Sequence, residues 1–265
     1  LLREDNVLNM DTRSVLSTIP LIEDSVIESL EPFDLFDLRS TLSANGKKFL
    51  KSFITKESVN TTDNLLSWYT SQMMKWELEV TKKPLTQLDG WKVNKWAIEG
   101  DEHFFSVIGV NVTAGTREQT HWMQPLLKDT HIGLLVFICQ EIEGVLHFLV
   151  QAKVEAGNLD LIELAPTVSC SNYEYVKTKQ NRPFLFDEIF EGKNHILFDS
   201  LQSEEGGRFY EIQNRNMIVE IPEGMKFDLP FNYAWMTLAQ MKEFMRYGKF
   251  NIEARSIISG ISFID

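Results

Sequence analysis

The sequence predicts an α+β domain, because strands dominate the middle of the chain and helices dominate its ends. The central observation is a pair of apolar, β-branched segments, residues 134–142 and 145–154, joined by a Glu-Gly turn. A glycine-containing tight connection between two such segments is typical of a β-hairpin. A third apolar segment, 159–164, ends at Pro166, where proline stops ladder pairing. We expect these strands at the centre of an antiparallel sheet, with the functional cleft along its edge.

Before the hairpin, the pattern predicts one helix and three strands. From residue 63 to residue 82, apolar side chains recur at three- and four-residue steps, which is the pattern of a helix with one packed face. Segments 91–98 and 104–113 alternate as strands do. We expect a third strand over 116–122, stopped by Pro125.

After the hairpin, the pattern predicts short strands followed by two helices. A short helical piece opens at Arg182-Pro183. The predicted elements are strands over residues 195–200, 208–212 and 216–221, a helix over 237–247 that ends at Gly248, and a final helix over 252–258.

Composition bounds the class of protein. The 265 residues are 43% hydrophobic, which suffices for one packed domain with an appendage or for two small ones. The net charge of −12 argues against a general nucleic-acid or anionic-membrane binder. No apolar segment approaches the roughly 18 residues of a membrane span, and no signal-peptide pattern opens the chain. Cys139 and Cys170 lie inside apolar segments and are expected as free thiols. We expect a cytoplasmic protein.

The two ends of the chain resemble each other. Residues 9–19 align with residues 251–261, with identical Asn, Arg, Ser, Ser and Ile and with the same order of apolar and polar positions. This match predicts an internal repeat. Residues 1–20 would then be the C-terminal helix of a preceding repeat, 21–62 a linker with short helices, and 63–265 one module. We expect this module to pair with a preceding module or to form a homodimer.

Five short motifs carry a family resemblance. They are FFSVxGV at 104–110, RExxxWxQPLL at 117–127, QAxVExG at 151–157, ELAPTV at 163–168 and EEGGRF at 204–209. Together, and in this order, they resemble the NDP-hexose 2,3-dehydratases of deoxysugar biosynthesis over most of residues 60–262. The resemblance implies a Nudix-like module with a mixed, mainly antiparallel sheet flanked by helices. It also implies a nucleotide-linked 4-keto-6-deoxyhexose, typically the dTDP sugar, as substrate.

The implied reaction requires acid–base chemistry and no cofactor or metal. In a 4-keto sugar the C3 proton is α to a carbonyl, so a base can remove it while a donor stabilises the oxygen on C4. Glu163, at the end of a strand, is the candidate base. Tyr173 is a candidate donor to O4 or to the leaving hydroxyl, and His121 a candidate acid or base. Each has a non-catalytic alternative: Glu163 as a paired carboxylate at a strand end, Tyr173 as a tyrosine at the rim or an interface, and His121 as a surface histidine.

The same motifs supply candidates for substrate binding. Arg117 and Arg208 suit the diphosphate, which favours a bidentate guanidinium, although a salt bridge is the alternative for each. Trp122 would stack on the base or sugar unless it belongs to the core. The remaining candidates are short polar groups for sugar hydroxyls or the pyrimidine edge, and one carboxylate in a glycine-rich loop: Gln124, Gln151, Thr167, Asn172 and Glu205.

Two functions therefore compete. The first is a lyase that removes water across C2 and C3 of the nucleotide sugar. The second is a non-catalytic nucleotide-sugar-binding module of Nudix-like fold. A Nudix hydrolase is disfavoured, because the sequence contains no Gly-x5-Glu followed by Arg-Glu-x-x-Glu-Glu.

Overall fold

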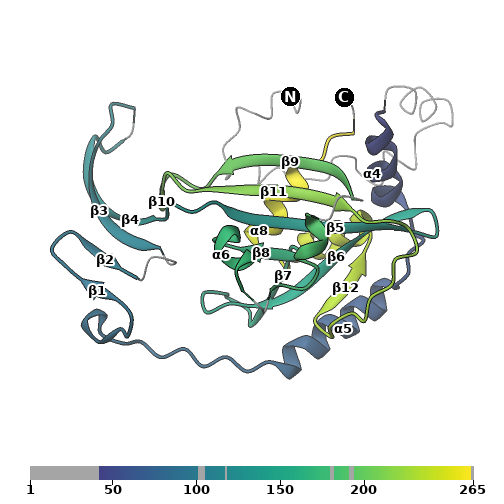
Figure 1. The fold of residues 1–265 in the computed structure, drawn as a ribbon, viewed down its shortest axis with the longest axis horizontal. Helices are drawn as coiled ribbons and strands as arrows, with labels where there is room; N and C mark the ends of the chain where they lie inside the picture. Colours follow the sequence, from purple (N-terminus) through teal and green to yellow (C-terminus); the bar gives the residue numbers. More distant parts are fainter. Residues whose placement is uncertain (1–41, 101–104, 117, 180–181, 191–193, 264–265) are drawn as a thin grey trace.

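The fold comes from a computed structural model that describes residues 42–100, 105–116, 118–179, 182–190 and 194–263. The predicted repeat at 1–20, the first half of the predicted linker at 21–62 and the candidate Arg117 lie outside these residues. Within them, the chain forms two sheets with helices packed on the larger one (Figure 1). The predicted α+β class, with a mixed, mainly antiparallel sheet flanked by helices, is confirmed.

The larger sheet is built on the predicted hairpin. Its path runs β12-β6-β5-β11-β9, with β7 paired to β6 and β8 paired to β5. Its strands are β5 (Gly133–Ile142), β6 (Val145–Val154), β7 (Ile162–Ala165), β8 (Val168–Cys170), β9 (His195–Ser203), β11 (Gln213–Glu220) and β12 (Tyr233–Met236). Strand β5 pairs with β6 in antiparallel register, as expected for the hairpin, but with β11 in parallel register, so the sheet is mixed at its centre. The alternation in the sequence marked β5 as a strand but carried no information about its second neighbour.

Strands β5 and β6 separate along their length, and the β7–β8 segment fills the fork. Strand β6 pairs with β5 near Phe148 but with β7 from Gln151 onward, while β8 pairs with the start of β5. The Thr167 hydroxyl sits at the branch point, where it donates to Leu149 O at 2.5 Å and accepts from Ile138 N at 2.9 Å. It thereby satisfies two backbone groups that the separating strands leave open.

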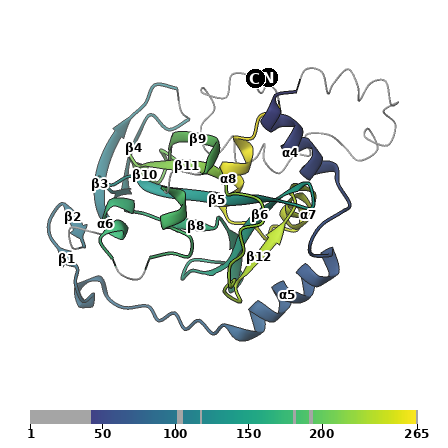
Figure 2. The same cartoon turned by 45° about the vertical axis from the view of Figure 1, so that its right-hand side comes forward.

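Alternating side chains of the central strands build a core on each face of this sheet. Leu135 and Phe137 of β5 point to the face covered by four helices, and Leu134 and Val136 point to the opposite face. The four helices are α4 (Ala44–Ile54), α5 (Thr62–Lys75), α7 (Leu238–Arg246) and α8 (Ile252–Ser259). On the opposite face lie α6 (Tyr173–Lys177) and the 3-10 turn η3 (Asp187–Ile189). Figures 1 and 2 show α6 and α8 on opposite faces of the sheet.

The smaller sheet projects from the larger one as an arm (Figures 1 and 2). Its order is β1-β2-β3-β4-β10, and only the β4–β10 pairing is parallel. The strands are β1 (Lys92–Val93), β2 (Ala97–Glu99), β3 (Ser106–Thr113), β4 (His121–Lys128) and β10 (Phe209–Tyr210), preceded by the 3-10 turn η2 (Leu85–Gln87). Three chain segments join the arm to the body: the stretch between α5 and β1, the turn from β4 to β5, and the loop around β10.

For three of the predicted elements whose bounds differ from the structure, a local reason is visible. The strand expected at 116–122 begins at His121 and continues through Pro125, which is tolerated because β10 pairs only with the two residues after Leu126. The strand expected at 91–98 is broken by Asn94, whose Oδ1 accepts from two following backbone N–H groups. The helix expected to reach residue 82 ends at Lys75, because Trp76 is extended and stacks on Phe231.

Caps explain the helix starts that the sequence marked. Thr237 caps α7 through a capping box with Gln240, and Asn251 caps α8. Gly248 follows α7 with φ of +65°, as predicted for a glycine at a helix end. Strand β12, strand β8 and helix α6 were not predicted, since each is short and lacks a clear period. In the part of the chain that the structure describes, no helix is long and apolar enough to cross a membrane.

Candidate functional site

A cavity of about 680 Å³ lies where the arm meets the larger sheet. Apolar side chains from the arm form one wall: Phe105, Leu127 and Phe209. The opposite wall comes from β5, β6, β8 and β11 of the larger sheet, and the first turn of α8 closes one side. Its charged and polar lining includes Asp129, His131, Lys153, Glu155, Ser169, Asn172, Glu204, Arg208, Asn214 and Glu253. A concave site with a few convergent polar groups is the usual form of a small-molecule site.

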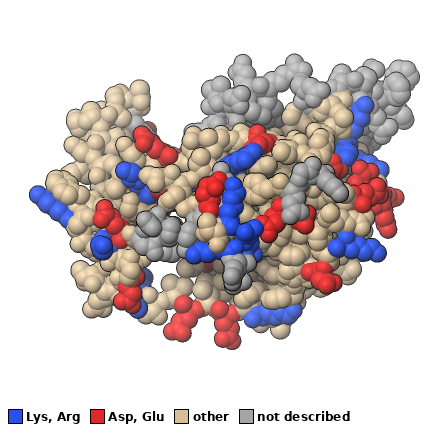
Figure 3. Space-filling model, viewed as in Figure 1, with Lys and Arg blue, Asp and Glu red and all other residues tan. Residues whose placement is uncertain are grey.

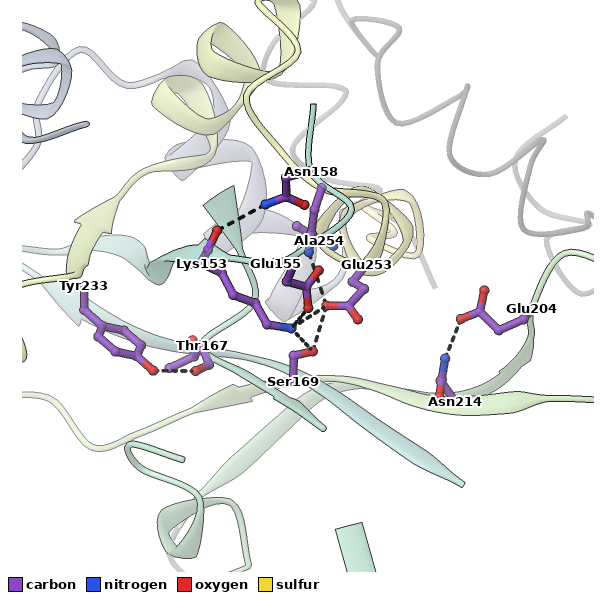
Figure 4. Close-up of polar contacts among 11 residues, drawn as sticks. Lys153, Glu155, Asn158, Thr167, Ser169, Glu204, Asn214, Tyr233, Glu253 and Ala254 are labelled. Atoms are coloured by element: carbon purple, nitrogen blue, oxygen red, sulfur yellow. Dashed lines mark hydrogen bonds and ion pairs between the residues drawn. The ribbon is translucent and has the colours of Figure 1, made fainter. Parts of the chain in front are cut away.

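A network around Lys153 occupies the wall formed by the larger sheet (Figure 4). The Lys153 ammonium donates to Ser169 Oγ at 3.0 Å and lies 2.6 Å from Glu155 and 3.7 Å from Glu253. The Ser169 hydroxyl in turn donates to Glu253 Oε2 at 2.7 Å. Burial lowers the pKa of Lys153, but the charge of Glu253 and the bond to Glu155 outweigh it and raise the pKa, so the side chain stays cationic.

Two of the segments that join the arm to the body also line the cavity: the turn from β4 to β5 and the loop around β10. In the first, His131 Nδ1 lies 2.7 Å from Asp129 Oδ1, which also accepts from the His131 backbone N–H. In the second, Arg208 forms an ion pair with Glu205, and its side chain is still 63% exposed. The guanidinium therefore has N–H groups free to meet a ligand at the mouth of the cavity.

Glu204 differs from the other carboxylates of the cavity. It follows the last residue of β9, and its backbone N–H donates to Ile212 O at 2.9 Å. Its carboxylate accepts a hydrogen bond from the Asn214 amide, as Figure 4 shows. Burial raises the pKa of Glu204, and the charges of Glu253 and Glu205 add to this, whereas the Asn214 hydrogen bond and the charge of Arg208 oppose it.

Asn214 is held in place by a close contact with β5. A Cβ built on Gly133 would lie 2.0 Å from Asn214 Oδ1 and 3.2 Å from Cys170 O. Only glycine therefore lets this amide lie against the start of β5. Gly133 thus positions the Asn214 amide, and this amide holds the Glu204 carboxylate at the cavity.

Two of the predicted site residues, Arg208 and Asn172, line this cavity. Glu205 pairs with Arg208 at its mouth. Glu163 lies on β7 opposite Lys153 and is not among the described lining residues. Burial raises the pKa of Glu163, and the charge of Glu155 raises it further. It is therefore a cross-strand neighbour of Lys153 that does not line the cavity.

The remaining catalytic candidates lie apart from the cavity or next to it. His121 is exposed on the arm, with its Nδ1 3.1 Å from Thr113 Oγ1. Tyr173 begins α6 directly after the cavity residue Asn172, but its side chain lies outside what the structure describes.

Four other binding candidates have structural contacts outside the cavity lining. The Trp122 indole donates to Gln124 Oε1 at 2.5 Å, and Gln124 Nε2 donates to Gly207 O at 2.8 Å, which ties the arm to the loop that carries Arg208. Thr167 is completely buried at the strand fork. Gln151 is half-buried on β6, opposite Ala165 of β7.

Sequence reasoning missed Lys153, Ser169, Glu253 and the Asp129–His131 pair. Lys153 had a usable signal, because it is a cation in an otherwise apolar strand. Ser169 and Glu253 had no such signal, since they lie 16 and 100 residues along the chain from their partner Lys153.

The chemistry of the lining decides what it can hold. Four described carboxylates (Asp129, Glu155, Glu204, Glu253) face two described cations, Lys153 and Arg208. Among the residues that the structure describes, no group of three or more His, Cys, Asp or Glu side chains has the arrangement of a metal site. Burial raises the pKa of the cavity thiol Cys170 to about 11, so it is present as the thiol and not as a nucleophilic thiolate.

Comparisons with known proteins agree on one family. The model of the NDP-hexose 2,3-dehydratase family matches residues 62–261. A dTDP-4-dehydro-6-deoxy-α-D-glucopyranose 2,3-dehydratase of Saccharopolyspora spinosa is 37% identical, over 98% of this chain and 53% of that protein. Enzymes of the same name from Amycolatopsis orientalis and Streptomyces violaceoruber are 33% and 32% identical, over 99% and 98% of this chain and 50% and 54% of their own. The chain thus spans about half the length of the curated relatives it matches.

Solved structures are more distant. An ADP compounds hydrolase has a TM-score of 0.36 at 19% identity, over 58% of this chain and 82% of that one. A Nudix hydrolase from M. smegmatis has a TM-score of 0.28 at 8% identity, over 52% and 93%. Likenesses at this level carry no argument about the site.

Proposed function

Because this chain belongs to the NDP-hexose 2,3-dehydratase family, we propose that it removes water across C2 and C3 of a nucleotide-diphospho-4-keto-6-deoxyhexose. The names of its relatives favour the dTDP sugar as substrate. The product is an enol that tautomerises to a 3,4-diketo-2,6-dideoxyhexose. The observation that carries the proposal is that four of the five family motifs, at 104–110, 117–127, 151–157 and 204–209, contribute residues to one cavity lined by cations, amides and carboxylates.

The reaction needs a proton acceptor for C3, a donor for the oxygen on C4, and a proton for the departing C2 hydroxyl. The cavity offers carboxylates for proton transfer and Lys153 and Asn172 as donors. No electrons leave the substrate, so the chemistry calls for no hydride cofactor. Closure between the arm and the body would keep water away from the enolate.

The charges of the lining residues indicate which end of the substrate, the sugar or the diphosphate, lies inside the cavity. With four carboxylates against two cations, the interior repels a dianionic diphosphate and suits a neutral sugar ring. Arg208 lies at the mouth with most of its side chain exposed, and its planar guanidinium suits a phosphate. We therefore assign the sugar to the interior and the diphosphate to the Arg208 side. The roles predicted for the other site residues stay predictions: Glu163, Tyr173, His121, Arg117, Trp122, Gln124, Gln151, Thr167 and Glu205.

A coupled assay tests the proposal. The full-length protein is incubated with dTDP-4-keto-6-deoxyglucose, a C3 ketoreductase and NADPH. NADPH consumption that requires the protein supports a lyase. Consumption that is lost in EDTA would instead assign the chemistry to a bound metal.

The second candidate is a nucleotide-sugar-binding module without turnover. It is favoured by one observation: the chain spans only about half of its relatives, so the chemistry can belong to the other half. Calorimetric binding of dTDP without NADPH consumption would support this function. In either case Arg208→Met should weaken dTDP binding about tenfold, whereas Lys242→Met on α7, away from the cavity, should leave it unchanged.

A further inference from the structure

We propose that Glu204 is the catalytic acid–base of this cavity, and that it carries the proton from C3 of the sugar to the departing C2 hydroxyl. The assignment rests on the proposed dehydratase function. The Glu204 carboxylate takes the C3 proton, and the C–H electron pair forms the enolate between C3 and C4. The enolate then forms the C2–C3 double bond as the C2–O bond breaks. Glu204 returns the proton to the leaving oxygen, so water departs and the carboxylate is restored.

Position is the first argument. Glu204 lies between the last residue of β9 and the glycine-rich loop, and its backbone is fixed by the hydrogen bond to Ile212 O at 2.9 Å. Asn214, fixed against Gly133, donates to one carboxylate oxygen. The other oxygen has no hydrogen bond to a described residue and is left for substrate. A carboxylate held at one oxygen on a strand end is oriented without being neutralised.

The partners of the carboxylates are the second argument. Of the four described carboxylates in the lining, Asp129 pairs with His131, and Glu155 and Glu253 both pair with Lys153. Glu204 has a neutral amide as its partner instead. Glu155 and Glu253 must give up an ion pair with Lys153 to accept a proton, whereas Glu204 has no ion pair with a described residue.

Its surroundings also tune Glu204 for proton transfer. Burial raises its pKa, and the nearby charge of Glu253 adds to this. A carboxyl shifted toward neutral pH both accepts and returns a proton more readily than an ordinary one. Glu163 shares the raised pKa but not the position, because it is a cross-strand neighbour of Lys153 and does not line the cavity.

Deuterium exchange in the full-length protein tests the assignment. Wild type, Glu204→Gln and the control Glu141→Gln are incubated with dTDP-4-keto-6-deoxyglucose in D2O. Turnover is followed by the coupled assay, and deuterium at C3 of recovered substrate by NMR. Glu141 is a partly exposed carboxylate near the end of β5 whose ion pair is with Lys48 of α4, away from the cavity. The glutamine at 204 keeps an oxygen for the Asn214 amide, so the loop should keep its shape.

We expect Glu204→Gln to lower kcat by 10²–10⁴-fold, to abolish exchange at C3, and to leave the Kd for dTDP within threefold of wild type. Glu204→Asp should have a kcat between those of wild type and Glu204→Gln, with the acidic limb of its pH–rate profile displaced. Turnover of Glu204→Gln within threefold of Glu141→Gln overturns the assignment. So does exchange at C3 that persists without elimination, because another base would then take that proton. An inactive wild-type protein refutes the proposed function itself.

Discussion

Replacing Ser169 by alanine should destabilise the cavity wall, because this hydroxyl links a cation to a carboxylate. It accepts from Lys153 at 3.0 Å and donates to Glu253 at 2.7 Å. A hydrogen bond to a charged group contributes about 1.5–3 kcal/mol. All three side chains are partly exposed, so water replaces part of what is lost. We therefore expect the two bonds together to account for about 2 kcal/mol of the free energy of unfolding.

The assay is urea unfolding of the full-length protein followed by fluorescence, with a thermal scan beside it. For a domain of this size, about 2 kcal/mol corresponds to a fall in Tm of roughly 4–8 °C. Ser256→Ala is the matched control, since its hydroxyl donates only to a carbonyl of its own helix at 2.8 Å. Salt at 0.5 M should reduce the difference between the two variants, because it screens the charged partners. A loss at Ser169 no larger than that at Ser256 would refute the reasoning.

Three further changes test the packing around the site. Gly133→Ala should displace Asn214, whose Oδ1 would lie 2.0 Å from the new Cβ, and should cost about 1–3 kcal/mol in urea unfolding while lowering turnover in the coupled assay. Ser52→Ala removes a buried hydroxyl that bonds both β6 and the start of α7, and should lower the free energy of unfolding by about 1–3 kcal/mol without changing the Kd for dTDP. Burial raises the pKa of Glu204 above its unfolded value of roughly 4.3, so its stabilising contribution is complete below that pH and is lost as the pH rises through the folded pKa. As the pH rises from 4 to 8, the free energy of unfolding of Glu204→Gln should therefore increase relative to that of wild type. If the difference between the two proteins stays constant over that range, the burial of this carboxyl is contradicted.

The sequence predicted those parts of the fold that depend on local pattern. The hairpin of β5 and β6 was predicted to within one residue, because a Glu-Gly turn separates two long apolar segments. Helix α7 was predicted with Gly248 at its end, and α8 as the segment that follows it; in the structure Thr237 and Asn251 cap their starts. The parallel pairing of β5 with β11 is different in kind. It joins residues about 80 positions apart, and neither strand carries a local mark of its partner.

The candidate site was predicted only in part, and the division has a physical cause. Arg208 and Asn172 were found because they lie in or beside motifs that a family resemblance makes visible. Thr167 lies in such a motif too, yet it is completely buried and closes the fork between β5 and β6. A motif therefore marks residues that matter without saying whether they serve the ligand or the backbone.

The position of the cavity explains why its charged network escaped sequence reasoning. Lys153 of β6, Ser169 of β8 and Glu253 of α8 meet only because β5 and β6 separate and admit the β7–β8 segment between them. The same separation ends the direct pairing of the hairpin strands, so the Thr167 hydroxyl has to replace it. The fork thus brings the first turn of α8 within reach of β6 and creates a polar wall in an otherwise apolar sheet. A variant that closes the fork should remove the network and the cavity together, whereas one that only neutralises Lys153 should leave the fork intact.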